Sequence, residues 1–210
     1  DAGEQCDGLF AVVYRDFKAA HPDFEGAVVS EHGIVLSDLG TDKKPVFNES
    51  GSFQTVESRA TFDQWYRNVP GTNMPIEAQL ELTKEGNGWV YDSNSFFPID
   101  GQGFGNEAND HNFHFTMELH SLFSYNGGEI FTFRGDDDLF LFINGKLAID
   151  LGGVHGVQEA TADMDELASE LGITPGNTYS FDLFFAERHT TQSNFRVETT
   201  ISCFTGDFIF

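Results

Sequence analysis

Apolar and polar residues alternate along much of the chain with a period of two. Successive side chains of a strand point to opposite faces of a sheet, so each alternating segment predicts a strand of an antiparallel sheet with one buried face. The clearest segments are residues 76–83, 113–119, 179–185 and 195–201.

A hairpin is predicted around Asn144 and Gly145. Both residues tolerate a positive φ, and runs typical of strands stand on either side of them. The first run, residues 139–143, is apolar at every position. The sequence therefore predicts a strand at the centre of a sheet, covered on both faces.

Helical patterns are short and few. Residues 163–171 combine a capping Asp163, one apolar face and a following Gly172, which predicts a helix. A second short helix is predicted over residues 61–68. Without a linker, an internal repeat or a low-complexity tract, residues 1–210 are predicted to form a single domain. We expect an all-β fold, an antiparallel β-sandwich with a few short peripheral helices.

The charge balance excludes some classes of partner. The chain has 34 acidic and 11 basic residues, a net charge of −23. Nucleic acids and anionic membranes attract Lys and Arg, so neither is an expected partner. Hydrophobic residues make up 40% of the chain, which is enough for a core, and no apolar run is long enough to insert across a bilayer.

The two cysteines, Cys6 and Cys203, lie near opposite ends of the chain. In an oxidising compartment they would pair, and closing so long a loop would stabilise the fold by roughly 4–5 kcal/mol on the chain-entropy model. The alternative is two buried free thiols. The chain begins at Asp1 without Met, as after removal of a signal peptide or after a cut. We expect the disulfide and an extracellular location, secreted or at the cell surface.

Three adjacent carboxylates, Asp136, Asp137 and Asp138, stand directly before the most apolar predicted strand. Beside a low-dielectric core they repel one another, and their desolvation is costly. Arg134 offers a single positive charge nearby. Ca²⁺, which takes about six to eight oxygen ligands, would neutralise them. The alternative is a solvated acidic loop at the start of a strand.

Strand geometry limits which of these carboxylates can share an ion. In an ordinary strand Asp136 and Asp138 point to the same face. Asp136 and Asp137 converge only if the peptide between them bends sharply, for instance in a cis bond. Both arrangements remain open from the sequence. An EF-hand is excluded, because the required Glu spacing and the flanking helices are missing.

Two further polar stretches offer possible ligands. Residues 187–194 lie between two predicted strands and are rich in neutral oxygens and amides, which suit calcium and sugar hydroxyls. The alternative is an ordinary surface loop in which Glu187, Arg188 and His189 form an ion-pair cluster. Zinc held by His155 and His189 is a weaker alternative, because the two are far apart in sequence. Residues 100–110 read either as a flexible loop or as a site for a further ion.

Several motifs resemble the fibro-slime domain, and together they extend over nearly the whole chain. That domain looks like a branch of the protective-antigen-type β-sandwich superfamily, which includes flocculin-type and bacterial-adhesin lectin modules. The longest similar segments are residues 133–147, 150–156 and 185–195, with supporting matches at 21–25, 65–71, 96–100 and 112–116.

The resemblance implies a jelly-roll-like sandwich in which two Asp residues, joined by a cis peptide, hold Ca²⁺ together with a second loop. Carried onto this sequence, the pair is Asp136 and Asp137, and Asn194 is the best side-chain ligand of the second loop. Asp138, which stands where relatives often have a small residue, and Ser193 are further candidate metal ligands. Sugar hydroxyls would complete the coordination, in contact with Asp136, Asp137, His189, Thr190, Thr191 and Gln192.

We therefore expect a calcium-dependent lectin module of a secreted or cell-surface adhesin, part of a larger multidomain protein that binds a cell-surface or matrix carbohydrate. One alternative is a structural module of an extracellular matrix protein, in which calcium only makes a loop rigid. A glycan-degrading enzyme is less favoured. Hydrolysis needs two carboxyl groups about 5–9.5 Å apart with different pKa values, and adjacent calcium-bound Asp residues are poor acids. We expect no enzymatic activity.

Overall fold

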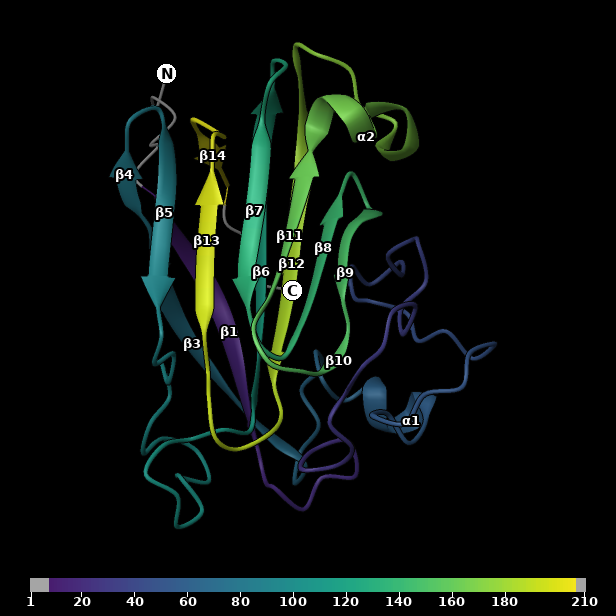
Figure 1. The fold of residues 1–210 in the computed structure, drawn as a ribbon, viewed down its shortest axis with the longest axis vertical. Coiled ribbons are helices and arrows are strands. Elements are labelled where there is room, and N and C mark those ends of the chain that lie inside the picture. The colour runs from purple at the N-terminus through teal and green to yellow at the C-terminus, as the bar shows by residue number, and fades with distance from the viewer. Residues whose placement is uncertain (1–7, 207–210) are drawn as a thin grey trace.

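The computed structural model describes residues 8–206 and consists of two antiparallel sheets packed face to face (Figure 1). The seven-stranded sheet has the order β3-β1-β6-β12-β8-β9, with β14 beside β6, and the five-stranded sheet has the order β11-β7-β13-β5-β4. A short pair, β10-β2, lies apart from both. This arrangement confirms the predicted β-sandwich. The strands are β1 (Leu9–Phe17), β2 (Val29–Ser30), β3 (Asn73–Glu81), β4 (Thr83–Glu85), β5 (Gly88–Ser93), β6 (Phe115–Tyr125), β7 (Ile130–Gly135), β8 (Asp138–Ile143), β9 (Lys146–Leu151), β10 (Gly153–Val154), β11 (Gln158–Asp163), β12 (Asn177–Glu187), β13 (Phe195–Thr199) and β14 (Phe204–Thr205).

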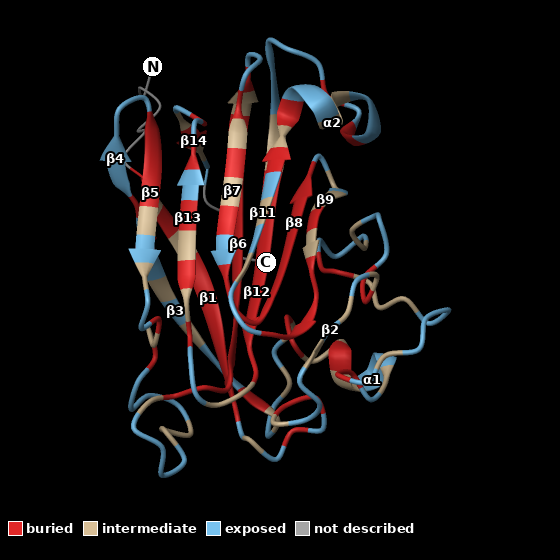
Figure 2. Ribbon diagram, viewed as in Figure 1, coloured by how far each residue is buried: buried red, intermediate tan, exposed pale blue. Residues whose placement is uncertain are grey.

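The main core lies between the two sheets, and alternate residues of β8 belong to it. Leu139, Leu141 and Ile143 pack in this core, whereas Phe140 and Phe142 belong to a second apolar cluster. β8 is buried along its whole length (Figure 2). The unbroken apolar run thus marks a central strand with cover on both faces, as predicted.

Residues 18–72, which connect β1 to β3, supply that second cover; we call them the cover segment. Their apolar side chains, among them Trp65 and Tyr66, pack against Phe140, Phe142 and Phe184 of the seven-stranded sheet. The segment contains β2 and a single-turn helix, α1 (Arg59–Phe62).

Helix α1 is shorter than the helix predicted over residues 61–68 and begins two residues earlier. A capping box sets its start. The Ser58 hydroxyl accepts the Thr61 N–H, and the Thr61 hydroxyl accepts the Ser58 N–H.

The predicted hairpin and the helix predicted over residues 163–171 are both present. Asn144 and Gly145 have φ values of 52° and 73°, and they join β8 to β9. Helix α2 (Met164–Leu171) begins after Asp163, whose carboxylate accepts two N–H groups of the first turn. It ends at Gly172, which adopts the left-handed conformation with φ 65°.

The Cys6–Cys203 disulfide stays a prediction, because Cys6 lies outside the described residues. No cysteine within residues 8–206 is free. The two helices of this part of the chain are too short to cross a membrane.

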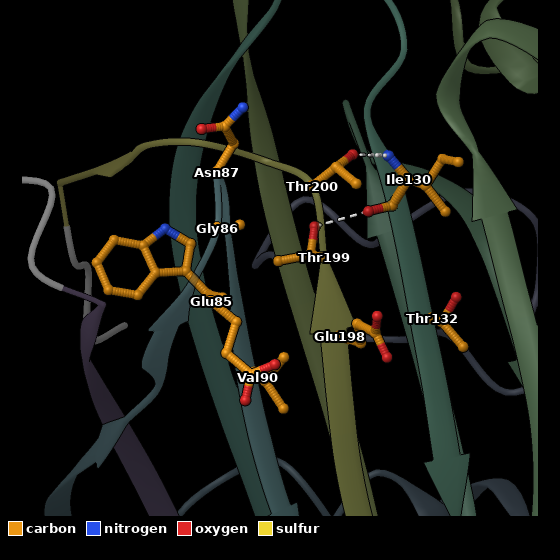
Figure 3. Close-up of a pocket in the computed structure, with 11 residues that line it drawn as sticks. Glu85, Gly86, Asn87, Val90, Ile130, Thr132, Glu198, Thr199 and Thr200 are labelled. Atoms are coloured by element: carbon orange, nitrogen blue, oxygen red, sulfur yellow. Dashed lines mark hydrogen bonds between the residues drawn. The ribbon is translucent and has the colours of Figure 1, made fainter.

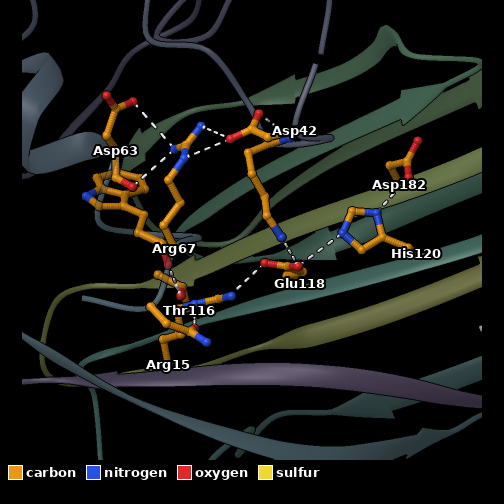
Figure 4. A network of polar contacts seen from close by, with 11 residues as sticks. Arg15, Asp42, Asp63, Arg67, Thr116, Glu118, His120 and Asp182 are labelled. Carbon is orange, nitrogen blue, oxygen red and sulfur yellow. Dashed lines mark hydrogen bonds and ion pairs between the residues drawn. The ribbon is translucent and has the colours of Figure 1, made fainter. Parts of the chain in front are cut away.

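A buried group of ion pairs ties the cover segment to the seven-stranded sheet (Figure 4). Glu118 on β6 lies 2.7 Å from Nη1 of Arg15 on β1 and also pairs with Lys44 of the cover segment. Next to it, His120 places Nε2 3.1 Å from Glu118 Oε1 and Nδ1 2.7 Å from Asp182 Oδ1. Both ring nitrogens therefore face carboxylates, which favours the doubly protonated imidazolium.

We predict that His120 makes the fold more stable at mildly acidic than at alkaline pH. Burial opposes the charged ring, but the hydrogen bonds to Asp182 and Glu118 outweigh burial and raise the pKa of His120 above 6.5. Lys44 and Arg15 also form ion pairs with the Glu118 carboxylate. A pKa raised by folding gives stability that is complete below the unfolded pKa and is lost as the pH rises through the folded pKa.

Urea unfolding of the parent chain and of His120→Gln, followed from about pH 6 to about pH 9, measures this dependence. The stability advantage of the parent chain over the variant should shrink as the pH rises. An advantage that stays constant over this range would contradict the assignment.

Candidate functional site

The acidic loop and the polar loop that were singled out in the sequence lie side by side at one end of the sandwich (Figure 1). β7 ends at Gly135, which pairs with Phe195, the first residue of β13. A side chain at Gly135 is excluded, because a Cβ there would lie 2.2 Å from the carbonyl oxygen of Asn194. This glycine lets the residues before β13 approach the end of β7 closely.

Three hydrogen bonds between Asp136 and Asn194 join the acidic loop to the second loop. The Asn194 N–H donates to Asp136 Oδ1 over 2.7 Å, and Asn194 Nδ2 donates to Asp136 Oδ2 over 2.8 Å. The Asp136 N–H donates to the Asn194 carbonyl over 3.2 Å. Burial raises the pKa of Asp136, although the two donors of Asn194 lower it in part. The structure thus brings these two predicted site residues together.

Asp137 follows Asp136 through a cis peptide bond, as the family resemblance implied. Its oxygens accept hydrogen bonds from the backbone N–H groups of His155, over 3.2 Å, and Arg188, over 3.1 Å. The side chain is only 4% exposed. Burial raises the pKa of Asp137 to about 8, against the lowering effect of the Arg188 charge. Within the described residues no side chain forms a hydrogen bond or an ion pair with this carboxylate.

The side chain of Asp138 points away from the core between the two sheets, toward the cover segment, and pairs with Arg188. Arg188 Nε lies 2.6 Å from Asp138 Oδ2 and Nη2 lies 3.0 Å from Oδ1, which also accepts the Gly153 N–H over 2.7 Å. The alternation along β8 explains this direction, because Asp138 shares its face with Phe140. The ion pair with Arg188 neutralises Asp138, so Asp138 is not included among the proposed metal ligands, and its predicted role stays a prediction.

Arg188 connects this ion pair to the cover segment. Its Nη1 donates to the carbonyl oxygens of Asp23, over 2.8 Å, and Thr55, over 2.7 Å. Its guanidinium lies 4.5 Å from the centre of the Trp65 ring. Neither Arg188 nor Asp138 has any exposed surface, so the pair is fully buried.

A pocket of about 230 Å³ opens beside the Asp136–Asp137 pair. All four predicted sugar-contacting residues of the second loop line it, whereas Ser193 does not. Ser193 is buried, and its O–H donates to the Phe96 carbonyl over 2.8 Å, so its predicted role as a metal ligand stays a prediction and is not part of the proposal below. The pocket is lined by Val28, Asp136, Asp137, Val154, His155, Gly156, His189, Thr190, Thr191 and Gln192.

The two histidines that are far apart in sequence both line this pocket. Each lies with Nδ1 against a backbone carbonyl, that of Gly156 for His155 and that of Thr190 for His189. Across residues 8–206, however, no three His, Cys, Asp or Glu side chains converge closely enough to hold a metal ion by themselves, and zinc held by these two histidines therefore lacks further ligands of these types.

Two residues have roles at the site that the sequence did not indicate. Glu25 of the cover segment accepts the Thr190 N–H over 3.0 Å and a hydrogen bond from His114 over 2.8 Å, so it holds the second loop in place. Glu187, for which an ion-pair cluster with Arg188 was one alternative, is fully buried, and neither of its oxygens accepts a hydrogen bond of full geometry among the described residues. Burial, followed by the charge of Asp137, raises the pKa of Glu187 well above its usual value.

A larger hollow of about 520 Å³ lies at the far end of β13 (Figure 3). Its hydroxyl groups are already used, because Thr199 donates to the Ile130 carbonyl and Thr200 accepts the Ile130 N–H. Residues 100–110 likewise bind to themselves and their neighbours, for example through Asn106 and Gly101. Neither region holds two adjacent buried carboxylates beside a pocket, as the Asp136–Asp137 site does.

Comparison with known families gives one match that covers more than half of the chain. Residues 78–204 match the model of the PA14 domain. This range contains the acidic loop and the second loop.

Similar proteins occur in Dictyostelium discoideum. Protein psiQ and protein psiC are each 40% identical to the chain over 92% of its length, and protein psiD is 44% identical over 81%. The chain spans 21%, 41% and 36% of these proteins, respectively.

Among solved structures, the PA14 domain of the MpAFP antifreeze protein is 12% identical, with a TM-score of 0.38, over 95% of this chain and 85% of that one. The PA14 sugar-binding domain from an RTX adhesin is 10% identical, with a TM-score of 0.37, over 95% of each chain.

We predict that Asp138→Asn strongly destabilises the fold. The change leaves the Arg188 charge buried without its counter-ion, at a cost of about 3–5 kcal/mol in the free energy of unfolding. Urea titration measures this cost. The double variant Asp138→Leu, Arg188→Met is the control, because it removes both charges and should cost less than the single change. A single change that costs under about 1 kcal/mol would contradict this role of the pair.

Proposed function

The chain belongs to the PA14 domain family, and we propose that it is a calcium-dependent carbohydrate-binding module of a secreted or cell-surface adhesin. One observation carries the proposal. Asp136 and Asp137 are both buried, no protein cation pairs with either among the described residues, and they border a pocket lined by neutral polar side chains.

The residues present fit a calcium ion. Carboxylate and amide oxygens are hard donors, which Ca²⁺ prefers, and the buried Asp137 with its raised pKa lacks a counter-charge. Asp136, Asp137 and Asn194 would hold the ion. Bound there, it would neutralise the pair and offer its remaining coordination positions to oxygen ligands.

The pocket suits a single neutral sugar residue. Its volume of about 230 Å³ is below the range of about 300–1,000 Å³ for drug-sized ligands. Thr190, Thr191 and Gln192 bring hydroxyl and amide groups that exchange hydrogen bonds with sugar hydroxyls. The pocket has no basic side chain apart from its two histidines, which disfavours ligands that bind through several negative charges.

The main alternative is a purely structural calcium site. A structural ion would be enclosed by protein ligands, whereas here a pocket lies directly against the carboxylate pair, which supports a site open to ligand. Hydrolysis is not proposed, because adjacent carboxylates that share one ion do not provide a separate acid and base.

The setting of the module is part of the proposal. Protein psiQ and protein psiC are several times longer and about twice as long as the chain, respectively, which supports a place in a larger multidomain protein. We propose an extracellular location, with a cell-surface or matrix glycan as the partner.

Asp137→Asn should abolish calcium binding and carbohydrate binding together. It removes one of two carboxylates from the ion, so the loss of affinity should exceed the roughly 10–100-fold typical for outer partners of a metal site. Calorimetry with calcium, followed by retention on a panel of immobilised monosaccharides, measures both properties. The parent chain should also unfold at a lower temperature in chelator than in calcium, because an ion that binds only the folded state stabilises it.

Asp92→Asn is the matched control. It removes the same charge from an exposed position on β5, whose ion pair with Arg196 contributes little, and it should leave both properties unchanged. Carbohydrate retention by the parent chain at full strength in chelator would refute the proposed mechanism.

A further inference from the structure

Glu187 is a buried carboxylate that the fold itself does not account for. It is the last residue of β12 and it has no exposed surface. Among residues 8–206 neither carboxylate oxygen accepts a hydrogen bond of full geometry, although the Ser193 hydroxyl and the His189 N–H lie close enough to lower the pKa of Glu187 in part. Buried polar groups in native proteins are nearly always satisfied, because an unpaired one costs folding free energy. An unsatisfied carboxylate therefore calls for a partner that the polypeptide does not provide.

Strand alternation explains which way Glu187 points. Phe181, Leu183 and Phe185 of β12 pack in the core between the sheets, and Glu187 continues the same alternate positions. Phe184 and Ala186 face the cover segment instead. Glu187 thus points to the inner face of the seven-stranded sheet. It lies at the end of the sheet where the acidic loop joins β7 to β8.

The charges nearest to Glu187 have the same sign as its own. Asp137 acts on it most strongly and Asp136 next. The following residue, Arg188, lies on the other face and is engaged by Asp138. The neighbouring Ser193 hydroxyl donates to the Phe96 carbonyl. In the described part of the chain, three carboxylates thus lie near one another with no protein cation paired to them.

We propose that Glu187 is a third carboxylate of the cation site, positioned behind Asp136 and Asp137, and that its charge strengthens the binding of the ion. This inference rests on the function proposed above and adds a residue to it. Glu187 does not line the pocket, so it acts on the ion through charge and through the position of the pair rather than by contact with the sugar. The number of negative charges around a calcium site is one determinant of its affinity.

Glu187→Gln is the direct test, because it keeps the size and shape of the side chain and removes only its charge. Calcium titration calorimetry should show an affinity about 10–100-fold weaker than that of the parent chain, the range typical for outer partners of a metal site. In chelator the variant should unfold at the same urea concentration as the parent chain or a higher one, because a buried amide is less costly than an unpaired carboxylate. The variant should gain less stability from a fixed calcium concentration.

Two controls accompany the test. Glu159→Gln removes the same group from an exposed position on β11 and should change neither calcium affinity nor stability. Glu187→Met places an apolar side chain of similar length at the buried position, and it should fold in chelator and bind calcium as weakly as Glu187→Gln does.

The outcomes separate this inference from the function on which it rests. If the parent chain binds no calcium, the proposed function and the role of Glu187 both fail. If the parent chain binds calcium and Glu187→Gln binds it equally well, only the role of Glu187 is overturned. Failure of both Glu187 variants to fold, with or without calcium, would also contradict the inference, because a residue that serves the ion is dispensable for the metal-free fold.

Discussion

The ion pair between Arg188 and Asp138 determines the chemistry of the whole site. Arg188 is a buried cation paired with the third of the consecutive aspartates. Asp138 and two backbone carbonyls accept its N–H groups, and Trp65 lies against one face of its guanidinium. Asp138 is thereby neutralised. Asp136 and Asp137 accept hydrogen bonds but have no cation paired with them in residues 8–206, and burial raises the pKa of both because it makes their charged forms costly. On the proposed function, a cation from solution would stabilise the charged forms of both carboxylates.

The cover segment is as important to the site as the sandwich. It provides the carbonyl groups of Asp23 and Thr55 that hold Arg188, and the Glu25 carboxylate that holds Thr190. These polar contacts lie beside the second apolar cluster, which keeps the segment against the seven-stranded sheet. The sheet positions the acidic loop, and the cover segment positions the loop opposite it. Sequence changes in the cover segment, even away from its pocket-lining residue Val28, should therefore alter the pocket.

Local patterns predicted the sandwich, the central strand, the Asn144–Gly145 turn and the α2 helix, because each depends on residues that are close together in the chain. The PA14-type superfamily was predicted from motifs, and the family match confirms it. The meeting of Asp136 with Asn194 was implied by the resemblance rather than by spacing. The partner of Asp138 was not predictable, because Arg188 lies 50 residues away and reaches it only through the pairing of β8 with β12.

Glu187 is a different case, since a signal for it exists in the sequence. The alternation of residues 181, 183 and 185 continues to residue 187, so a charged residue on the inner face of a strand was visible before the structure. The start of α1 also had a local signal, the Ser58 and Thr61 capping box, which the more prominent aromatic positions obscured. In both cases the pattern was present and a stronger neighbouring pattern was followed instead.

The central claim is that a sugar binds to an ion held by Asp136 and Asp137. A crystal structure of the chain grown with calcium and a retained monosaccharide tests it most directly, because anomalous scattering identifies the ion and its ligands independently of any assumed site. The account predicts one ion between the two carboxylates and Asn194, with sugar hydroxyls in its coordination shell and Asp138 still bound to Arg188. A sugar that occupies this pocket with no ion at the Asp136–Asp137 pair would contradict it.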